Sequence, residues 1–158
     1  MDPTQDRDSP EAVIRRYSDM VYRLAFARTG NTADAEDVYQ EVFLRYHRAA
    51  PDFESETHEK AWLLRVTVNR CKSLLASPWR KRSIPLEDVY ACPGPEASAV
   101  AEALAALPPG DRTLLHLYYY EGYRTEEIAR LLGRNGATVR SQLTRARQKL
   151  GRLLKEEP

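Results

Sequence analysis

Apolar residues recur through most of the chain at the three- and four-residue spacing that places them on one face of a helix. The first such segment opens at Ser9-Pro10, where a capping hydroxyl precedes a proline suited to the first helical position, and it ends near Gly30. Its apolar face consists of Val13, Ile14, Tyr17, Met20, Val21 and Leu24. We therefore expect a first helix that builds a core.

Two further helices are expected before the middle of the chain. Asn31-Thr32 is a capping pair for the second, and Ser55 or Thr57 begins the third, which extends to Leu75. The predicted buried stripe of the third helix is Ala61, Leu64, Val68, Cys71 and Leu75. On this interpretation Cys71 is a core thiol.

Prolines divide the chain into two parts. They interrupt any helix between about residues 76 and 95, so this segment, which includes Cys92, is predicted to be a linker. Beyond it we expect a helix over residues 96–107, stopped by Pro108-Pro109, and another that is capped by Asp111 and closes at Gly122. The sequence thus predicts an all-α protein of two small helical domains, residues 1–76 and 96–158, joined by a flexible linker at residues 77–95.

Residues 125–143 have the pattern of two short helices joined by a tight turn. Thr125 can cap the first helix, and Gly133 supplies the left-handed backbone that ends it. Asn135 can cap the second helix. The apolar stripe of that helix is Val139, Leu143, Ala146 and Leu150. This arrangement is typical of a helix-turn-helix, whose second helix enters the major groove of DNA.

The charge of this segment favours DNA binding. From Arg134 to Lys155 every charged residue is basic, whereas ordinary solvated helices mix signs because opposite charges one turn apart stabilise them. A helical hairpin with a solvated basic face is the alternative. The residues predicted to contact DNA are Arg134, Asn135, Thr138, Arg140, Ser141, Thr144, Arg145, Arg147 and Lys149.

A second cationic surface is expected on the third helix. Residues 60–82 contain no acid. The polar and aromatic side chains expected on or near the exposed side of this helix are Phe53, Lys60, Trp62, Arg65, Asn69, Arg70 and Lys72. Cations interleaved with aromatic rings suit a single strand, whose bases stack while the cations follow the phosphates. The sequence equally allows Trp62 to be a core residue and the cations to be merely solvated.

The second helix presents an acidic face. Its residues, spaced i, i+3, i+4 and i+7, are Asp37, Gln40, Glu41 and Leu44. On composition alone, a plain solvated surface is the favoured interpretation. A metal site or a catalytic pair of carboxylates is not supported, because nothing else converges with these acids.

Other features of the composition argue against several classes of protein. No run approaches the roughly 18 apolar residues of a membrane helix, and residues 1–11 are unlike a targeting peptide. The cysteines form no CxxC motif and the histidines are scattered, which argues against a disulfide framework or a structural zinc site. We expect a cytoplasmic protein with no cofactor and no metal. The chain shows no nucleophile, base or metal cluster at a spacing that indicates an enzyme.

Taken together, the motifs resemble those of the extracytoplasmic-function (ECF) sigma factors, which belong to the sigma-70 family of bacterial initiation factors. The resemblance extends from about Glu11 to Leu154. Residues 34–44 are similar to region 2.2, which in that family docks on the clamp helices of core RNA polymerase. Residues 61–71 are similar to regions 2.3 and 2.4, which melt and read the −10 element. The segment from Ala106 onward resembles region 4, whose second helix reads the −35 element.

The resemblance implies roles for the residues singled out above. It makes the acidic face a polymerase contact formed by Asp37, Gln40, Glu41 and Leu44, which reverses the interpretation as plain surface. It assigns −10 binding to Phe53, Lys60, Trp62, Arg65, Asn69 and Lys72, and −35 binding to the basic face of the last helix. Residues 51–60 would form a pocket for a flipped base. The implied partners are core RNA polymerase, through its clamp helices and flap, promoter DNA and an anti-sigma factor.

Two residues depart from the family's pattern. Arg134 stands where the family usually has an apolar residue, and Gln142 stands where a basic residue is common. A buried unpaired charge costs roughly several kcal/mol. We therefore expect the side chain of Arg134 to extend toward solvent. Acidic and basic segments alternate along the chain, a pattern that would let acidic surfaces cover basic ones in the free protein.

Two functions outside the family stay open. A stand-alone helix-turn-helix repressor or activator would bind its operator without polymerase, and it gives no reason for the acidic face. A helical adaptor would have no salt-dependent affinity for DNA.

Overall fold

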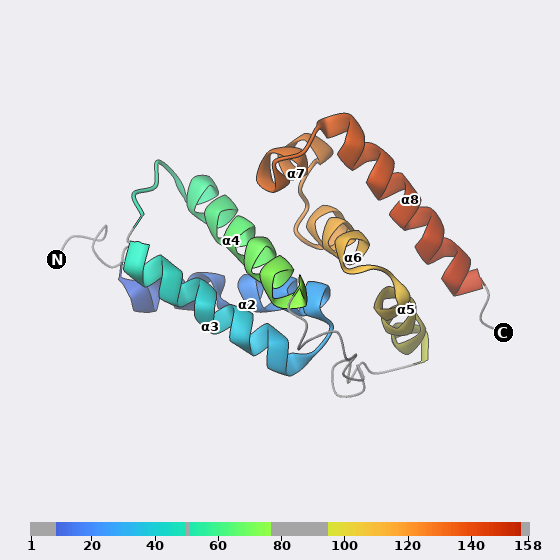
Figure 1. The fold of residues 1–158 in the computed structure, drawn as a ribbon, viewed down its shortest axis with the longest axis horizontal. Coiled ribbons are helices and arrows are strands. Elements are labelled where there is room, and N and C mark those ends of the chain that lie inside the picture. Colours follow the sequence, from blue (N-terminus) through green and yellow to red (C-terminus); the bar gives the residue numbers. More distant parts are fainter. Residues whose placement is uncertain (1–8, 50, 77–94, 156–158) are drawn as a thin grey trace.

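The computed structural model describes residues 9–49, 51–76 and 95–155, and within these ranges every regular element is a helix, as predicted (Figure 1). The N-terminal half contains α2 (Pro10–Thr29), α3 (Thr32–Ala49) and α4 (Glu56–Ala76). The C-terminal half contains α5 (Pro95–Ala106), α6 (Pro109–Leu115), the π-helical turn η3 (His116–Tyr120), α7 (Thr125–Leu132) and α8 (Gly136–Lys155). Most of the predicted linker, including Cys92, lies outside the described residues.

Local sequence signals set most helix ends. α2 begins at Pro10, and the hydroxyl of Ser9 accepts a hydrogen bond from the amide of Ala12 at 3.1 Å. α2 ends at Gly30, whose φ of 79° lies in the left-handed region that glycine adopts without strain. Side chains also cap three other helices, and the capping residues are Asn31, Ser55 and Asn135. The predictions for these four caps are confirmed.

Two predicted caps are wrong. Asp111 lies inside the first turn of α6, because that helix already begins at Pro109, whose fixed φ suits the first helical position. Thr125 is the first residue of α7 rather than its cap. The capping residue is Arg124, whose amide donates to Glu127 Oε1 at 3.1 Å. The free amide at the start of α7 is therefore hydrogen-bonded to a carboxylate inside the helix, instead of to a hydroxyl that precedes it.

One apolar cluster packs the three helices of the N-terminal half together. Its buried members are Val13, Tyr17, Val21, Ala25, Ala35, Val38, Val42, Phe43, Leu63, Cys71 and Leu74. Ile14, which the pattern places on the buried face of the first helix, is 38% exposed. The reason is geometric, because adjacent residues of a helix point about 100° apart and the neighbouring Val13 takes the core position.

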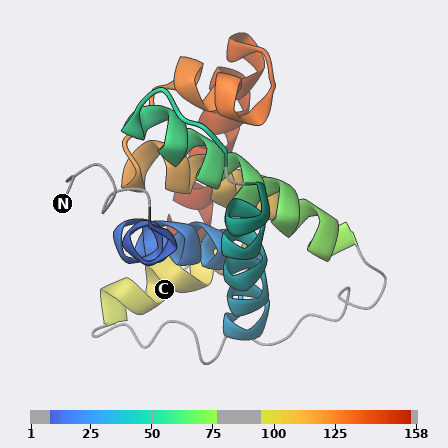
Figure 2. The ribbon, with the colours of Figure 1, turned by 90° about the vertical axis from the view of Figure 1, so that its left-hand side faces the viewer.

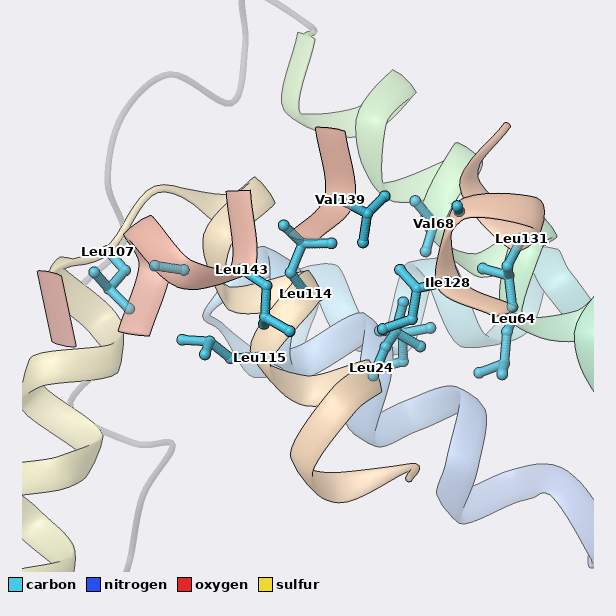
Figure 3. Close-up of a cluster of buried hydrophobic side chains, with 13 residues drawn as sticks. Leu24, Leu64, Val68, Leu107, Leu114, Leu115, Ile128, Leu131, Val139 and Leu143 are labelled. Carbon is cyan, nitrogen blue, oxygen red and sulfur yellow. The ribbon is translucent and has the colours of Figure 1, made fainter. Parts of the chain in front are cut away.

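A second apolar cluster crosses between the two halves (Figure 3). It combines Leu24 of α2 and Leu64 and Val68 of α4 with buried residues of α6, η3, α7 and α8. Leu24 and Leu64 are fully buried, and burying a side chain of this size contributes about 1.5–3 kcal/mol. The two halves therefore share a core, although the sequence indicates separate domains.

The helix α4 is buried on two faces. Leu63 and Cys71 belong to the first cluster, whereas Leu64 and Val68 belong to the second. In both ribbon views α4 lies between α3 and α7 (Figures 1 and 2). The predicted single stripe of this helix is therefore incomplete, since a helix between two partners needs apolar residues on opposite sides.

Arg112 of α6 fastens the C-terminal end of α2. Its Nε donates to the carbonyl of Ala27 at 2.8 Å, and its Nη2 donates to the carbonyl of Arg28 at 2.7 Å. A third bond, from Nη1 to the carbonyl of Leu107 at 2.8 Å, holds the segment before α6. The guanidinium also meets the negative end of the α2 dipole. Beside it, Arg28 Nη1 donates to Thr113 Oγ1 at 2.8 Å, a second polar contact between the halves.

Replacing Arg112 by leucine is expected to lower the free energy of unfolding by about 2–4 kcal/mol, because hydrogen bonds to charged groups contribute about 1.5–3 kcal/mol each. Urea denaturation followed by circular dichroism measures the change. Arg15→Leu, at an exposed position of α2, is the control and should change stability by no more than about 0.5 kcal/mol. Equal effects of the two substitutions would contradict a clasp at Arg112.

Candidate nucleic-acid interface

The outer face of α8 presents a row of exposed polar and basic side chains. The helix turns Val139, Leu143 and Ala146 into the second core cluster, which leaves the opposite face to solvent. Eight of the predicted DNA contacts are exposed: Asn135, Thr138, Arg140, Ser141, Thr144, Arg145, Arg147 and Lys149. This arrangement suits a recognition helix that enters a major groove.

The turn before α8 brings the two departures from the family's pattern together. Gly133 has a φ of 67°, and the next amide, that of Arg134, closes α7 by donating to the carbonyl of Ala129 at 2.8 Å. Arg134 Nη1 donates to Gln142 Oε1 at 2.9 Å. Arg134 is half-buried, so its guanidinium needs a partner that an apolar residue would not need, and the amide oxygen supplies one.

Three cations of α8 contact side chains of their own half, and the first is Arg140, whose Nη1 lies 3.7 Å from Glu126 Oε1. The guanidinium of Arg147 lies 5.3 Å from the ring centre of Tyr118 and 5.9 Å from that of Tyr119. Lys149 Nζ lies 3.0 Å from Asp111 Oδ2. Contacts between exposed charges contribute only about 0–1 kcal/mol, so such side chains can exchange partners readily.

On α4, the cations Lys60 and Arg65 both contact the C-terminal half. Lys60 Nζ lies 3.5 Å from Glu121 Oε2 and 5.3 Å from the ring centre of Tyr123. Arg65 Nε donates to the carbonyl of Leu131, in α7, at 3.2 Å. Two of the side chains that the sequence assigns to −10 DNA are thus engaged with protein groups in this structure.

Positive charge gathers near the end of α4. Burial lowers the pKa of Lys72, and the nearby charges of Arg134 and Arg28 lower it further. Burial likewise lowers the pKa of Arg28, with a contribution from Arg134 in the same direction. Asn69, on the same helix, is exposed. Like charges from both halves therefore approach one another where the halves meet.

Phe53 and Trp62 belong to an aromatic cluster at the start of α4. Their ring centres are 5.9 Å apart, and the ring of Tyr46, in α3, lies 6.0 Å from Phe53 and 5.8 Å from Trp62. His58 lies 5.3 Å from Phe53. Both Phe53 and Trp62 are half-buried. The sequence leaves Trp62 open between a core residue and a stacking platform, and in the structure it is packed yet still partly accessible.

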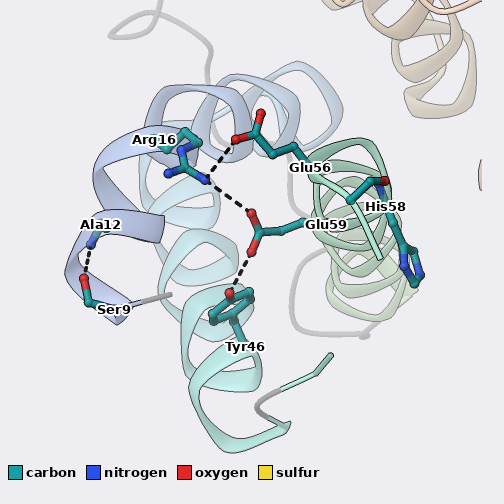
Figure 4. A network of polar contacts seen from close by, with 8 residues as sticks. Ser9, Ala12, Arg16, Tyr46, Glu56, His58 and Glu59 are labelled. Carbon is teal, nitrogen blue, oxygen red and sulfur yellow. Dashed lines mark hydrogen bonds and ion pairs between the residues drawn. The ribbon is translucent and has the colours of Figure 1, made fainter. Parts of the chain in front are cut away.

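A buried carboxylate anchors this end of α4 (Figure 4). Glu59 Oε2 accepts a hydrogen bond from the Tyr46 hydroxyl at 2.8 Å, and Glu59 Oε1 lies 3.6 Å from Arg16 Nη1. Arg16 Nη1 also lies 3.9 Å from Glu56 Oε1. These contacts tie α4 to α2 and α3 and so fix the place from which the next residue, Lys60, projects.

The acidic face of α3 adjoins an apolar groove. Asp37 and Gln40 are exposed, Glu41 is half-buried and Leu44 is 46% exposed. The groove has a volume of about 460 Å³ and is lined by Ile14, Tyr39, Gln40, Phe43, Leu44, Tyr46 and His47. An accessible apolar patch rimmed by polar residues is typical of a surface that binds another protein.

Sequence reasoning missed several residues of these surfaces. Five side chains of the groove have no predicted role as a site: Ile14, Tyr39, Phe43, Tyr46 and His47. The sequence did contain a signal for Ile14, because two adjacent residues of a helix, here Val13 and Ile14, cannot both face the same core. Glu121, which contacts Lys60, has no local signal, because its partner lies far along the chain.

Metal sites and membrane-spanning helices are absent from the described part of the chain. Among those residues, no three or more histidine, cysteine, aspartate or glutamate side chains are grouped so that they could hold a metal ion. None of the described helices is long and apolar enough to cross a membrane. The candidate sites are therefore the surfaces of α3, α4 and α8.

Two family matches cover most of the chain in order. Residues 13–81 match Sigma-70 region 2, and residues 97–150 match Sigma-70, region 4. The first range contains the α3 face and the α4 cations, and the second contains the helix-turn-helix. The chain therefore has the two-region organisation of a sigma-70-type initiation factor.

Two solved structures show the same fold over both halves. The sigma factor RpoE of Bartonella quintana, solved in complex with the anti-sigma factor NepR, has a TM-score of 0.73 at 22% identity and covers 94% of this chain and 98% of its own. CnrH, solved in complex with the cytosolic domain of CnrY, has a TM-score of 0.71 at 26% identity and covers 94% and 89%.

Curated relatives define the family more narrowly. The chain is 34% identical over 154 residues to the ECF RNA polymerase sigma factor SigM of Mycobacterium tuberculosis, covering 94% of this chain and 79% of the relative. It is 35% identical over 157 residues to the ECF RNA polymerase sigma factor SigE of Mycolicibacterium smegmatis, covering 89% and 59%. The chain belongs to the ECF family of RNA polymerase sigma factors. It is an alternative sigma factor that directs transcription initiation.

Glu121 gives the contact between the halves a defined pH dependence. Burial raises the pKa of Glu121, but contact with His116 and the charge of Lys60 outweigh it, so the pKa lies below the ordinary value of 4.5. A carboxylate with a depressed pKa contributes stability above its ordinary pKa, and this contribution is lost as the pH falls through the depressed value.

Glu121→Gln is therefore expected to unfold more easily than the native chain near neutral pH, with a difference that shrinks as the pH falls below about 4.5. Urea denaturation at a series of pH values measures it. Glu102→Gln, at an exposed position of α5, removes the same charge and should show no such pH-dependent difference. A difference between native chain and Glu121→Gln that stayed constant down to pH 3, roughly, would show that the carboxylate charge is not involved.

Proposed function

We propose that this sigma factor docks on core RNA polymerase with region 2 and reads two promoter elements with separate surfaces. One observation above all supports this: both sigma-70 regions occur in order on a chain that exposes an acidic face on α3 and a basic face on α8. Residues 1–76 and 96–158 are the proposed functional units, joined by residues 77–95. The protein works in the cytoplasm as a specificity subunit rather than a catalyst, and it requires no cofactor.

The α3 face supplies the contact with the clamp helices. Gln40 and Leu44 line the apolar groove, and Asp37 and Glu41 place negative charge beside it. A helix that inserts an apolar side chain into the groove and carries basic residues around it would match both the shape and the charge. Charge complementarity of this kind mainly speeds and orients association, while the apolar contact holds the complex together. The flap of the polymerase is the proposed partner of region 4.

The melted −10 strand lies along α4 in this proposal. Phe53 and Trp62 offer partly accessible rings for bases, and stacking on such rings contributes about 1–3 kcal/mol per base. Flipping a base out of a duplex costs a few kcal/mol, roughly, so stacking alone barely offsets it. The proposed polar contacts that shift the balance are Lys60, Arg65, Asn69 and Lys72.

The −35 duplex is read by α8. We assign the base edges to Arg140, Ser141 and Arg145, which are exposed along the helix. The proposed phosphate contacts are Arg134, Arg147 and Lys149, with Asn135, Thr138 and Thr144 completing the surface. Since exposed contacts such as that of Lys149 with Asp111 are weak, a phosphate can replace the carboxylate.

An anti-sigma protein is the proposed regulatory partner. CnrH, which shares 26% identity with this chain, was solved in complex with the cytosolic domain of CnrY. The groove on α3 offers such a protein an apolar site, and occupying it would exclude polymerase from the same residues.

The docking face predicts a result with purified proteins. The native chain should co-elute with bacterial core polymerase on size exclusion, and Asp37→Ala/Gln40→Ala should lose co-elution because both substitutions remove exposed groups of the docking face. Glu36→Ala, which removes an exposed acid of α3 outside that face, is the control and should co-elute. If the native chain ignored polymerase but bound duplex DNA tightly, it would instead be a stand-alone regulator.

The recognition helix predicts how specificity divides among its cations. With a −35 duplex selected by the native chain, Arg140→Ala should reduce discrimination against a scrambled duplex by about 1–3 kcal/mol, because arginine can bind guanine through two hydrogen bonds. Lys149→Ala should weaken binding to both duplexes about equally. Fluorescence anisotropy at fixed salt measures both. Equal losses on the two duplexes for Arg140→Ala would refute its assignment to a base edge.

A further inference from the structure

Three cations from separate segments approach one another beside the apolar cluster that the two halves share. Arg28 comes one helical turn after Leu24 in α2, and Lys72 comes one turn after Val68 in α4, so each lies on the same side of its helix as a buried member of the cluster (Figure 3). Arg134 belongs to the turn that leads into α8, whose apolar face packs on that cluster. The charges of Arg134 and Arg28 add to burial in lowering the pKa of Lys72, as expected of three cations that lie close together.

The most buried of these cations, Arg28, has a donor without an acceptor. Arg28 is 9% exposed, and its Nη1 donates to Thr113 Oγ1 at 2.8 Å. That hydroxyl in turn donates to the carbonyl of Pro109 at 2.8 Å, so it can only accept from the guanidinium. Arg28 Nε is shielded from water and has no hydrogen-bond partner among the described residues. Because an unpaired buried donor is destabilising, an acceptor that reached this nitrogen would bind favourably.

The three positive charges are not neutralised by the groups around them. Among the described residues, no carboxylate forms an ion pair with Arg28, Lys72 or Arg134. The side chains that accept hydrogen bonds from Arg28 and Arg134 are a hydroxyl and an amide, and both are neutral. Burial raises the pKa of the nearby Cys71 to about 12, so this thiol is also uncharged near neutral pH. Like charges held together in this way favour the binding of an anion between them.

The types of side chain in this cluster suit a phosphate group. Lys72 and Arg134 are half-buried, so both can be reached from solvent, whereas Arg28 lies deeper. A guanidinium binds phosphate oxygens through directed N–H donors, and an ammonium adds a compact positive charge. A terminal phosphate carries about 1.5–2 negative charges near pH 7 and three strong acceptor oxygens. Such a group could therefore accept from all three cations at once.

We infer that Arg28, Lys72 and Arg134 form a binding site for the terminal phosphate group of a small molecule. Arg28 supplies a buried donor, and the other two supply charge on the solvent side. The inference goes beyond the proposed function, because it requires no DNA and uses Arg28, to which the promoter contacts assign no role. A DNA backbone offers similar phosphate chemistry, but a duplex contacts exposed side chains, whereas Arg28 is nearly buried. A small anion therefore fits this cluster better.

The first test titrates the full chain with pyrophosphate in an isothermal calorimeter, near neutral pH and at fixed ionic strength. The native chain should bind one pyrophosphate. Lys72→Gln and Arg134→Gln should each weaken binding about tenfold, because each removes a charged hydrogen bond to the phosphate. Lys155→Gln, at an exposed position of α8, removes the same charge as Lys72→Gln and should bind like the native chain. Equal weakening by Lys72→Gln and Lys155→Gln would overturn the site, since it would show only a general attraction to the chain's positive charge.

The second test measures thermal unfolding with and without pyrophosphate, with potassium chloride added to equalise the ionic strength. A ligand that binds only the folded chain raises the melting temperature, here by about 3–5 °C at roughly ten times the dissociation constant. At the same pyrophosphate concentration the shift should be smaller for Lys72→Gln and unchanged for Lys155→Gln. Circular dichroism establishes that each variant keeps its helices. A native chain that showed neither calorimetric binding nor a thermal shift would overturn the site.

A third measurement separates a small molecule from DNA as the source of the phosphate. Arg28→Gln should weaken pyrophosphate binding and leave the affinity for a scrambled duplex, measured by fluorescence anisotropy, at the native value. Arg15→Gln, at an exposed position of α2, is the matched control and should change neither. Equal losses for pyrophosphate and duplex in folded Arg28→Gln would overturn the small-molecule source and assign the site to the DNA backbone. A native chain that bound pyrophosphate but no DNA would count against the proposed function alone.

Discussion

The burial of α4 between two sets of helices is the constraint on which the rest of the structure depends. Its apolar residues serve the N-terminal cluster on one side and a cluster shared with the C-terminal half on the other. A helix used in this way has little surface left for polar residues, so its cations emerge near the edges of the contact. Lys60 and Arg65 accordingly contact groups of the other half, although both side chains remain partly exposed to water. Packing and the proposed binding of the −10 strand thus use the same helix.

Much of the fold could be predicted because the signals are local. Ser9-Pro10, Gly30, Asn31, Gly133 and Asn135 act within one helical turn, and the periodic stripe of α8 alone determines which of its residues face solvent. The contact between the halves could not be predicted, since it joins residues far apart in sequence. The same reason explains why the groove beside α3 was only half anticipated: Gln40 and Leu44 come from one helix, but Ile14 comes from another.

The electrostatics of the contact between the halves contain opposing terms. Arg112 closes the end of α2 with charged hydrogen bonds, and Glu121 neutralises a cation of α4. Against these, burial lowers the pKa of Arg28 and of Lys72, and the charge of Arg134 lowers both further. The buried apolar residues determine most of the free energy that holds the two halves together. The attractive and repulsive charges then raise or lower that free energy.

The hydrogen bond between Arg134 and Gln142 makes the recognition helix inseparable from the turn that precedes it. In a helix-turn-helix with an apolar residue after the turn glycine, the second helix could be exchanged between relatives as a cassette. Here the helix carries one half of a polar pair and the turn carries the other. A transplanted α8 lacking Gln142 would leave a half-buried guanidinium without its partner, and a turn lacking Arg134 would leave the amide without its donor. The smallest transferable unit of promoter specificity in this chain therefore begins at the turn.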